Sequence, residues 1–167
     1  MGMSHSCGHH DHDHAQLVGG DTAGKLAEAQ ALCVEAGERM TSSRLRTYEL
    51  ILEASGPIKA YDVIDRFHPD GAAKPPTVYR ALSFLEHMGL IHRIESLNAF
   101  VACGAHDHEL KHDHTAGFLL CDCCGKSVEI ALPRLADVQT NAEKVGFKVN
   151  HITLEARGLC MACREDA

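Results

Sequence analysis

The sequence predicts an α+β protein with a helical N-terminal domain that ends in a β-hairpin and a smaller mixed C-terminal domain. Three observations support this fold class. Apolar residues recur at helical spacing through most of the segment 25–88, and two short β-like stretches follow at 90–95 and 99–103. Two Cys-x-x-Cys pairs then stand in the last third of the chain. We place the boundaries at 1–24 for a tail, 25–104 for the first domain and 105–167 for the second.

The composition limits both the core and the class of protein. Aromatic residues make up 5% of the 167 residues and Trp is absent, so the core must consist of Leu, Ile, Val and Ala. No apolar run approaches the roughly 20 residues of a membrane span. The net charge is −7, but residues 39–93 carry eight Lys and Arg against six Asp and Glu. Cations placed at phosphates determine DNA affinity, so the total charge does not exclude a nucleic-acid partner.

The first 24 residues have no apolar periodicity, and we expect them to be disordered. Their metal-binding side chains are His5, Cys7, His9, His10, His12 and His14. Such a segment is either a weak metal-collecting tail or an inert one. The chain has eight Cys and no secretory signal, which favours the cytoplasm.

Four helices are expected in the first domain. The first covers residues 25–39. The second follows the potential N-caps Thr41 to Ser43 and ends before Gly56. The third and fourth cover residues 60–67 and 77–88. Pro75 and Pro76 precede the last of these, where proline is well tolerated.

The stretches 90–95 and 99–103 are expected to form a hairpin after the fourth helix. The last three of these helices followed by a hairpin predict a winged helix, in which the helix before the hairpin enters the major groove of DNA. Tyr79 and Arg80 lie near the start of that helix, and an arginine there could contact guanine or a phosphate. We therefore expect both residues to bind DNA.

The second domain is expected to contain strands at 118–121 and 127–130, a helix at 133–145 and a strand at 147–155. A domain of about 60 residues with few aromatic side chains is marginally stable alone. A metal and self-association are both plausible sources of the missing stability.

The two cysteine pairs are Cys121 with Cys124 and Cys160 with Cys163. A two-residue spacer lets both thiols of a pair face one ion, and four thiolates suit a tetrahedral structural zinc. The alternative is a redox role for each pair as a disulfide or a dithiol. Cys123 is an additional thiol inside the first pair, and we expect it to point away from the ion.

The string KPPTVYRALSFLEHMGLIHRIES, residues 74–96, followed by a His-rich stretch and CDCCG, resembles the ferric-uptake-regulator family and, within it, the zinc uptake regulators. The resemblance covers residues 25–164. It implies a homodimer with an N-terminal winged helix, a C-terminal dimerisation domain and a structural zinc held by four cysteines. Members of the family bind palindromic operators in double-stranded DNA when they are loaded with metal.

The resemblance also implies a second, regulatory zinc site in each subunit. The matching ligands are His92, Cys103, His114 and Glu129. Two nitrogens, a sulfur and a carboxylate oxygen favour zinc over iron. Tyr61 matches a DNA-contacting tyrosine of relatives. His112 either forms, with His151, a further metal site like that of some relatives or is a solvated loop residue.

The function that these features predict is a zinc-responsive transcriptional repressor of zinc-uptake genes. It would act without a membrane or a small-molecule substrate and would not be an enzyme. An iron or peroxide sensor of the same family is the first alternative. A zinc buffer or metallochaperone is the second, suggested by the His-rich tail, but it leaves PPTVYRAL without a role.

Overall fold

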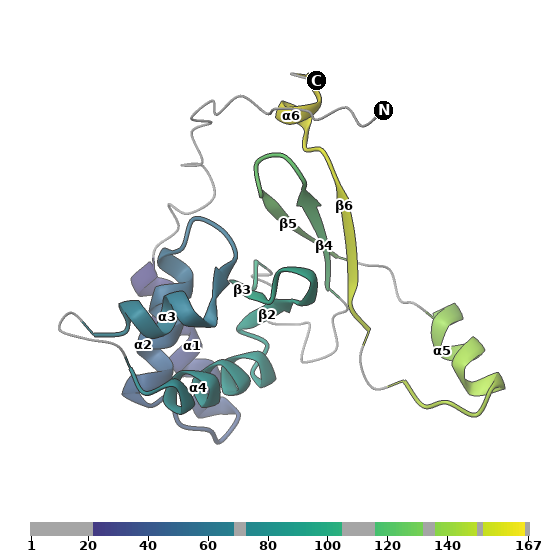
Figure 1. Ribbon diagram of the computed structural model, residues 1–167. Coiled ribbons are helices and arrows are strands. Elements are labelled where there is room, and N and C mark those ends of the chain that lie inside the picture. The colour runs from purple at the N-terminus through teal and green to yellow at the C-terminus, as the bar shows by residue number, and fades with distance from the viewer. Residues whose placement is uncertain (1–21, 69–72, 105–115, 132–135, 150–151, 166–167) are drawn as a thin grey trace.

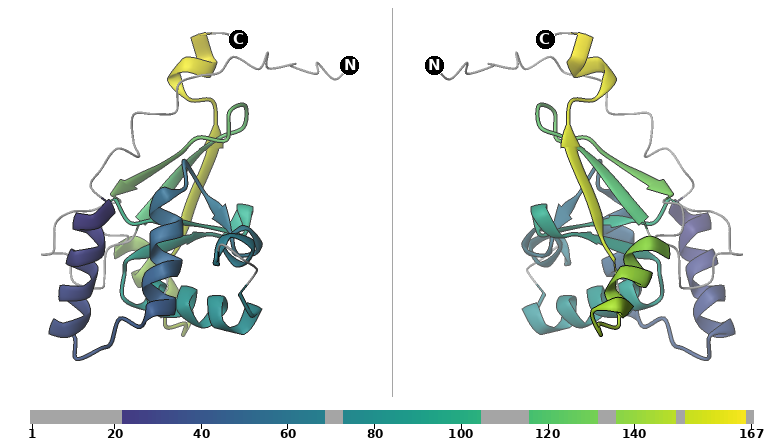
Figure 2. Two further views of the ribbon diagram at one scale, coloured as in Figure 1. Left: turned by 90° about the vertical axis from the view of Figure 1, so that its left-hand side faces the viewer. Right: turned by 90° about the vertical axis from the view of Figure 1, so that its right-hand side faces the viewer.

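The protein consists of a helical body and a second, smaller body built on its own sheet (Figure 1). The computed structural model describes residues 22–68, 73–104, 116–131, 136–149 and 152–165. Figure 2 shows the second sheet standing beside the helical body in two further views. In the described segments, no helix is both long and apolar enough to cross a membrane.

The N-terminal body contains four helices and a small sheet, as the sequence predicts. Its elements are α1 (Thr22–Glu35), α2 (Ser42–Glu53), β1 (Ile58–Lys59), α3 (Ala60–Arg66), α4 (Pro75–His87), β2 (Ile91–Ile94), the 3-10 turn η1 (Glu95–Leu97) and β3 (Ala99–Ala102). The strands are antiparallel in the order β1-β3-β2. Strand β1 was not predicted, because two residues are too few to show an alternating pattern.

The first helix is shifted from its predicted limits of 25–39. It begins at Thr22, so the predicted tail boundary at residue 24 falls inside α1. It ends at Glu35 because Gly37 takes the left-handed conformation, with φ at 71°. The N–H of Glu38 then donates to the carbonyl of Cys33 at 2.7 Å, which closes the helix as in a Schellman motif.

Local sequence signals fix the ends of the other helices. Thr41 caps α2, since its side chain accepts a hydrogen bond from the N–H of Arg44 at 3.4 Å. Helix α4 begins at Pro75, two residues before the predicted start, so that Pro75 and Pro76 both lie in its first turn. Proline is favoured there because the first N–H groups of a helix have no intrahelical partner.

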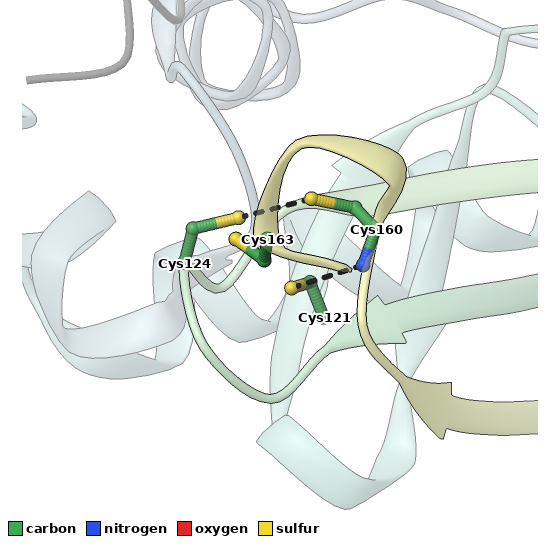
Figure 3. A group of neighbouring side chains, drawn as sticks. All are labelled: Cys121, Cys124, Cys160 and Cys163. Atoms are coloured by element: carbon green, nitrogen blue, oxygen red, sulfur yellow. Dashed lines mark hydrogen bonds between the residues drawn. The ribbon is translucent and has the colours of Figure 1, made fainter. Parts of the chain in front are cut away.

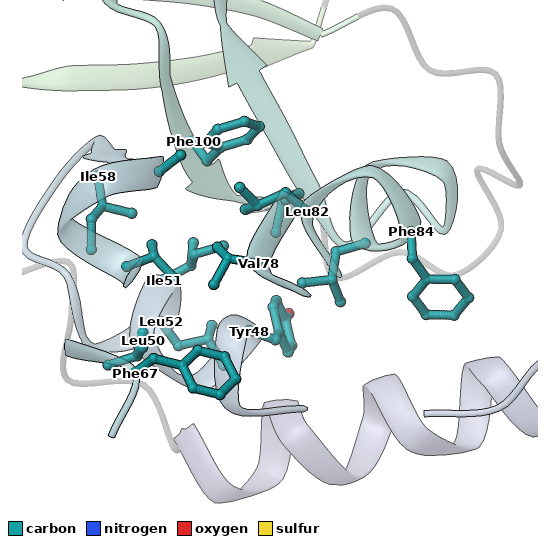
Figure 4. Close-up of a cluster of buried hydrophobic side chains, with 14 of the residues drawn as sticks. Tyr48, Leu50, Ile51, Leu52, Ile58, Phe67, Val78, Leu82, Phe84 and Phe100 are labelled. Carbon is teal, nitrogen blue, oxygen red and sulfur yellow. The ribbon is translucent and has the colours of Figure 1, made fainter. Parts of the chain in front are cut away.

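The main core lies between the helices and the first sheet (Figure 4). Leu82 and Leu85 hold α4 in this core and are at most 2% exposed. Val63 from α3 and Ile91 from β2 are equally buried. Because α4 packs on this side, its opposite face, with Tyr79 and Arg80, remains open to solvent.

The second body is a mixed three-stranded sheet with two short helices. Its elements are β4 (Ala116–Cys121), β5 (Ser127–Ala131), α5 (Ala136–Lys144), β6 (Leu154–Gly158) and α6 (Met161–Glu165). The order is β5-β4-β6, with β4 antiparallel to β5 and parallel to β6.

The predicted strand at 147–155 has the wrong limits, since it overlaps the observed strand β6 only at residues 154 and 155. Residues 147–149 form no strand, and Phe147 is 66% exposed. The residues that pair with β4 are 154–158, and this register places the end of β6 beside Cys121. Apolar alternation predicts that the strand starts at residue 147, but residues 147–149 pair with no strand among the described residues. Helix α6 was not predicted.

A second, smaller apolar cluster joins the two bodies. Ile94 from the hairpin packs with Phe118 and Leu120 from β4, and all three are at most 5% exposed. Leu97 and Val101 cover the cluster from the hairpin side. The wing hairpin is therefore packed against the second sheet.

Candidate metal centres and DNA-facing surface

The four cysteines of the two pairs meet at one end of the second sheet (Figure 3). Cys121 is the last residue of β4, and Cys124 lies in the turn after it. Cys160 directly precedes α6, and Cys163 lies inside that helix. The parallel pairing of β4 with β6 brings these two segments together.

The geometry of this cluster fits a tetrahedral zinc. The four sulfurs lie within 4.8 Å of one another, and those of Cys124 and Cys160 are 3.8 Å apart. Sulfurs about 2.3 Å from one tetrahedral zinc would be separated by about 3.8 Å. All four are free thiols, so neither pair is a disulfide here. Cys123 is not among the gathered sulfurs.

Backbone groups around the cluster favour ionised sulfur at Cys121. Burial alone would raise the pKa of this thiol, but backbone N–H groups of Cys124, Cys160 and Cys123 lower it to about 6. The N–H of Cys160 lies 3.4 Å from the Cys121 sulfur. Since zinc binds thiolate rather than thiol, this environment suits a metal ligand.

A second cluster of possible ligands lies where the hairpin meets the second sheet. It consists of His92 from β2, Cys103 just after β3, and Glu129 from β5. The Glu129 Oε1 is 3.3 Å from the His92 Nε2 and 3.9 Å from the Cys103 sulfur. Nitrogen and oxygen ligands at about 2.0–2.1 Å from a tetrahedral zinc would be separated by about 3.3 Å. The donor set therefore fits zinc.

Strand register explains why these three side chains meet. His92 pairs with Val101, which places Cys103 near it at the end of the hairpin. Glu129 pairs with Phe118, whose ring centre is 5.6 Å from that of His92. The ligand cluster therefore spans the boundary between the two bodies.

The surroundings of His92 shift its titration strongly. Burial alone would lower its pKa, but hydrogen bonds to Cys103 and Glu129, together with their charges, raise it to about 9. The three side chains thus already interact strongly, and each is only partly exposed.

A cleft of about 850 Å³ gives access to both clusters. Cys103 and Glu129 line it from one cluster, and Cys124, Cys160 and Cys163 line it from the other. Both clusters therefore contribute ligand side chains to one cleft.

Three other predicted ligands cannot be placed. His114, the expected fourth regulatory ligand, lies outside the described residues, and so do His112 and His151. Their metal-binding roles stay predictions.

The residues expected to contact DNA are accessible. Tyr79 is 46% exposed and Arg80 is exposed on the first half of α4. Tyr61 on α3 is 71% exposed. The far end of α4 is held by the guanidinium of Arg44, which lies 3.3 Å from the ring centre of Phe84. The position of α4 is thus fixed while its outer face stays open.

One contact between the two bodies was missed by sequence analysis. The carboxylate of Glu155 on β6 accepts hydrogen bonds from the N–H groups of Glu95 and Ser96 in η1. The chain contains many glutamates, and nothing local marks this one, since its partners are 59 and 60 residues away.

Comparisons with known proteins agree on one family. The profile described as "Ferric uptake regulator family" matches residues 35–157. The zinc uptake regulation protein of Escherichia coli strain K12 is 40% identical over 142 residues, covering 84% of this chain and 81% of that protein. The peroxide operon regulator of Bacillus subtilis strain 168 is 30% identical over 145 residues, covering 84% and 94%.

Solved structures of zinc uptake regulators show the same fold. A zinc uptake regulator complexed with zinc and DNA superposes with a TM-score of 0.78 at 39% identity. The superposition covers 87% of this chain and 96% of the chain of that regulator. The crystal structure of holo XcZur gives a TM-score of 0.76 at 37% identity, covering 87% and 99%.

Proposed function

The chain belongs to the ferric uptake regulator family, and from this premise we propose that it is a zinc-responsive transcriptional repressor that binds operator DNA as a homodimer and shuts off zinc-uptake genes. The observation that carries the proposal is the position of His92, Cys103 and Glu129. They join the wing of the DNA-binding body to the second sheet. The relatives near 40% identity are described as zinc uptake regulators, and one of them was solved with zinc and DNA, which agrees with a zinc-binding donor set.

Each subunit would hold one structural and at least one regulatory zinc. Cys121, Cys124, Cys160 and Cys163 are the proposed structural ligands. The regulatory ligands would be His92, Cys103 and Glu129, with His114 as the fourth. Zinc supplies coordinate bonds strong enough to hold segments from different parts of the chain.

The chain's own residues would convert metal binding into DNA binding as follows. His92 and Cys103 fix the two strands of the wing, and Glu129 fixes the second sheet relative to them. The wing and α4 share one body, so this sets the direction in which Arg80 and Tyr79 face. A dimer then presents two α4 helices at one spacing, which matches two operator half-sites.

An exposed apolar face supports the dimer. Leu119 on β4 pairs with Val128 on β5, and both point away from the wing because Phe118 points toward it. They are 43% and 38% exposed. A second copy of the chain would cover this face, and chain association would explain how so small a domain is stabilised.

The site does not favour an enzyme. A hydrolytic zinc keeps one position open for water. Four cysteines fill the first proposed site, and His114 would complete the second. We accordingly place the action of the protein in the cytoplasm, at DNA, without a small-molecule substrate. For iron sensing, Cys103 is an unfavourable ligand because thiolate selects softer metals.

The test is to incubate the purified protein with sheared genomic DNA from its source at buffered free zinc and to sequence the fragments that it retains. A matched sample with a chelator selective for the weaker site is the control. We expect a palindrome upstream of zinc-transport genes, retained only with zinc. Retention that does not depend on zinc, or that requires Fe(II) instead, would overturn the proposal.

A further inference from the structure

Three side chains that lie in one row across the second sheet contact the wing hairpin. Phe118 on β4 pairs with Glu129 on β5 and with Glu155 on β6. Directly paired residues of neighbouring strands point to the same face of a sheet. All three therefore face the hairpin, and the backbone positions of the two glutamates lie about 10 Å apart, since neighbouring strands are about 4.8 Å apart.

Each member of the row holds a different part of the wing. Glu129 accepts a hydrogen bond from the N–H of Gly104 at 2.8 Å, at the end of the hairpin. Phe118 packs with Ile94 in the apolar cluster between the two bodies. Glu155 holds the turn at the other end.

The contacts of Glu155 are of the kind that can fix a turn. Its Oε1 lies 2.7 Å from the N–H nitrogen of Glu95, and its Oε2 lies 3.2 Å from that of Ser96. No side chain caps η1 from within its own segment. Although burial acts in the opposite direction, hydrogen bonds from the Ser96 side chain and from both N–H groups lower the pKa of Glu155. The ionised form therefore predominates at neutral pH.

We propose that Glu155 is a positioning residue for DNA binding: a second, metal-independent tether that docks the wing turn on the C-terminal sheet and works together with the regulatory ligands. The inference rests on the proposed function. In a winged helix the hairpin lies beside the helix that enters the major groove, so the position of the turn that Glu155 holds affects how the DNA-binding body meets DNA.

The two tethers are energetically linked because both favour the docked wing. Loss of Glu155 increases the population of the undocked form, in which His92 and Cys103 are separated from Glu129. Part of the zinc-binding free energy is then used to return the wing to the docked form, so the apparent zinc affinity of the regulatory site falls. Saturating zinc would restore docking and with it most of the DNA affinity.

The first measurement uses Glu155→Ala, with Glu143→Ala as the matched control, because Glu143 is an exposed glutamate on α5. Competition with a chromophoric chelator gives the zinc affinity of the weaker site. We expect it to fall about tenfold in Glu155→Ala, the scale of hydrogen bonds to a charged acceptor, and to stay unchanged in the control. Equal zinc affinity in all three proteins would overturn the proposal.

The second measurement follows binding of the zinc-selected DNA duplex as free zinc is raised. Glu155→Ala should require about tenfold more zinc for half-maximal binding, yet reach wild-type DNA affinity within about twofold at saturation. A loss of DNA affinity that persists at saturating zinc would mean that Glu155 only shapes the turn, and this would contradict the proposal. If the wild-type protein shows no zinc-dependent DNA binding, the proposed function fails, but the zinc-affinity comparison still decides the tether.

Amide hydrogen exchange provides a readout without DNA. In the zinc-loaded protein, the Glu95 and Ser96 amides should exchange slowly in the wild type and faster in Glu155→Ala. If Glu155→Ala does not fold, Glu155→Gln is the second variant, since its carbonyl oxygen still accepts a hydrogen bond. Glu155→Gln should shift each quantity in the same direction by less. Identical exchange in the variant and the wild type would contradict the tether.

Discussion

Replacement of Cys103 by serine tests whether the second cluster is the switch. The backbone N–H of Cys103 donates to the carbonyl of Leu90 at 3.0 Å, so the strand end stays in place in the variant. A serine hydroxyl can still hydrogen-bond Glu129, but it does not ionise at neutral pH and is a poor zinc ligand. The substitution removes a ligand and little else.

The expected magnitudes follow from these contacts. Loss of a partner that only orients a metal ligand costs about 10–100-fold in metal affinity, so loss of the Cys103 thiolate should cost at least about 100-fold. The side chain is only partly buried, so the melting temperature should change by no more than about 2–4 °C. DNA affinity at a zinc level that fills the wild-type site should fall about 5–150-fold, the range of typical allosteric coupling.

The assay is fluorescence anisotropy of a labelled operator duplex in zinc buffers, with total bound zinc measured in parallel. Cys33→Ser is the matched control, because Cys33 is fully buried in α1 and belongs to neither cluster. It should lose about 1–3 kcal/mol of stability from the buried hydroxyl and keep its zinc response. If Cys103→Ser binds DNA with the zinc dependence of the wild type, the assignment of the switch is wrong.

Three further predictions concern the other parts of the molecule. Arg80→Ala should weaken operator binding by about 1–3 kcal/mol in anisotropy titrations with bound zinc unchanged; an unaltered DNA affinity would remove Arg80 from the interface. Cys160→Ser should lose the tightly held zinc and unfold the C-terminal domain, because a structural zinc contributes folding free energy directly; circular dichroism and zinc analysis would show both, and a folded zinc-free variant would contradict the assignment. Leu119→Asp should shift the protein from dimer to monomer in sedimentation, because Leu119 is 43% exposed on the sheet face that points away from the wing; a dimer of wild-type affinity would show that this face is not the interface.

Local features of the sequence were sufficient to predict all the described helices except α6, together with the cysteine cluster. Thr41 is an N-cap, and Pro75 with Pro76 can only begin a helix, so α2 and α4 follow from neighbouring residues. The spacing within each Cys-x-x-Cys pair likewise depends on a single turn. The predicted end of α1 is wrong because apolar periodicity continues past Glu35, whereas the left-handed conformation of Gly37 ends the helix.

Long-range strand pairing could not be derived from such signals. The alternation in 147–155 resembles a strand, but β6 is at 154–158 because its partner is β4. The same register places Glu155 beside Phe118, and no pattern within β6 indicates that partner. The meeting of His92 and Glu129 also depends on docking of the wing. The family resemblance suggested that pair, and the sequence alone gave no reason for it.

The most direct test of the account compares the affinity of the wild-type protein for one operator duplex at two levels of free zinc. Both levels must keep the four-cysteine site filled, and only the higher one fills the site at His92, Cys103 and Glu129. We expect DNA binding to be about 5–150-fold tighter at the higher level. Equal affinity at the two levels would show that the second cluster does not control DNA binding and would contradict the account.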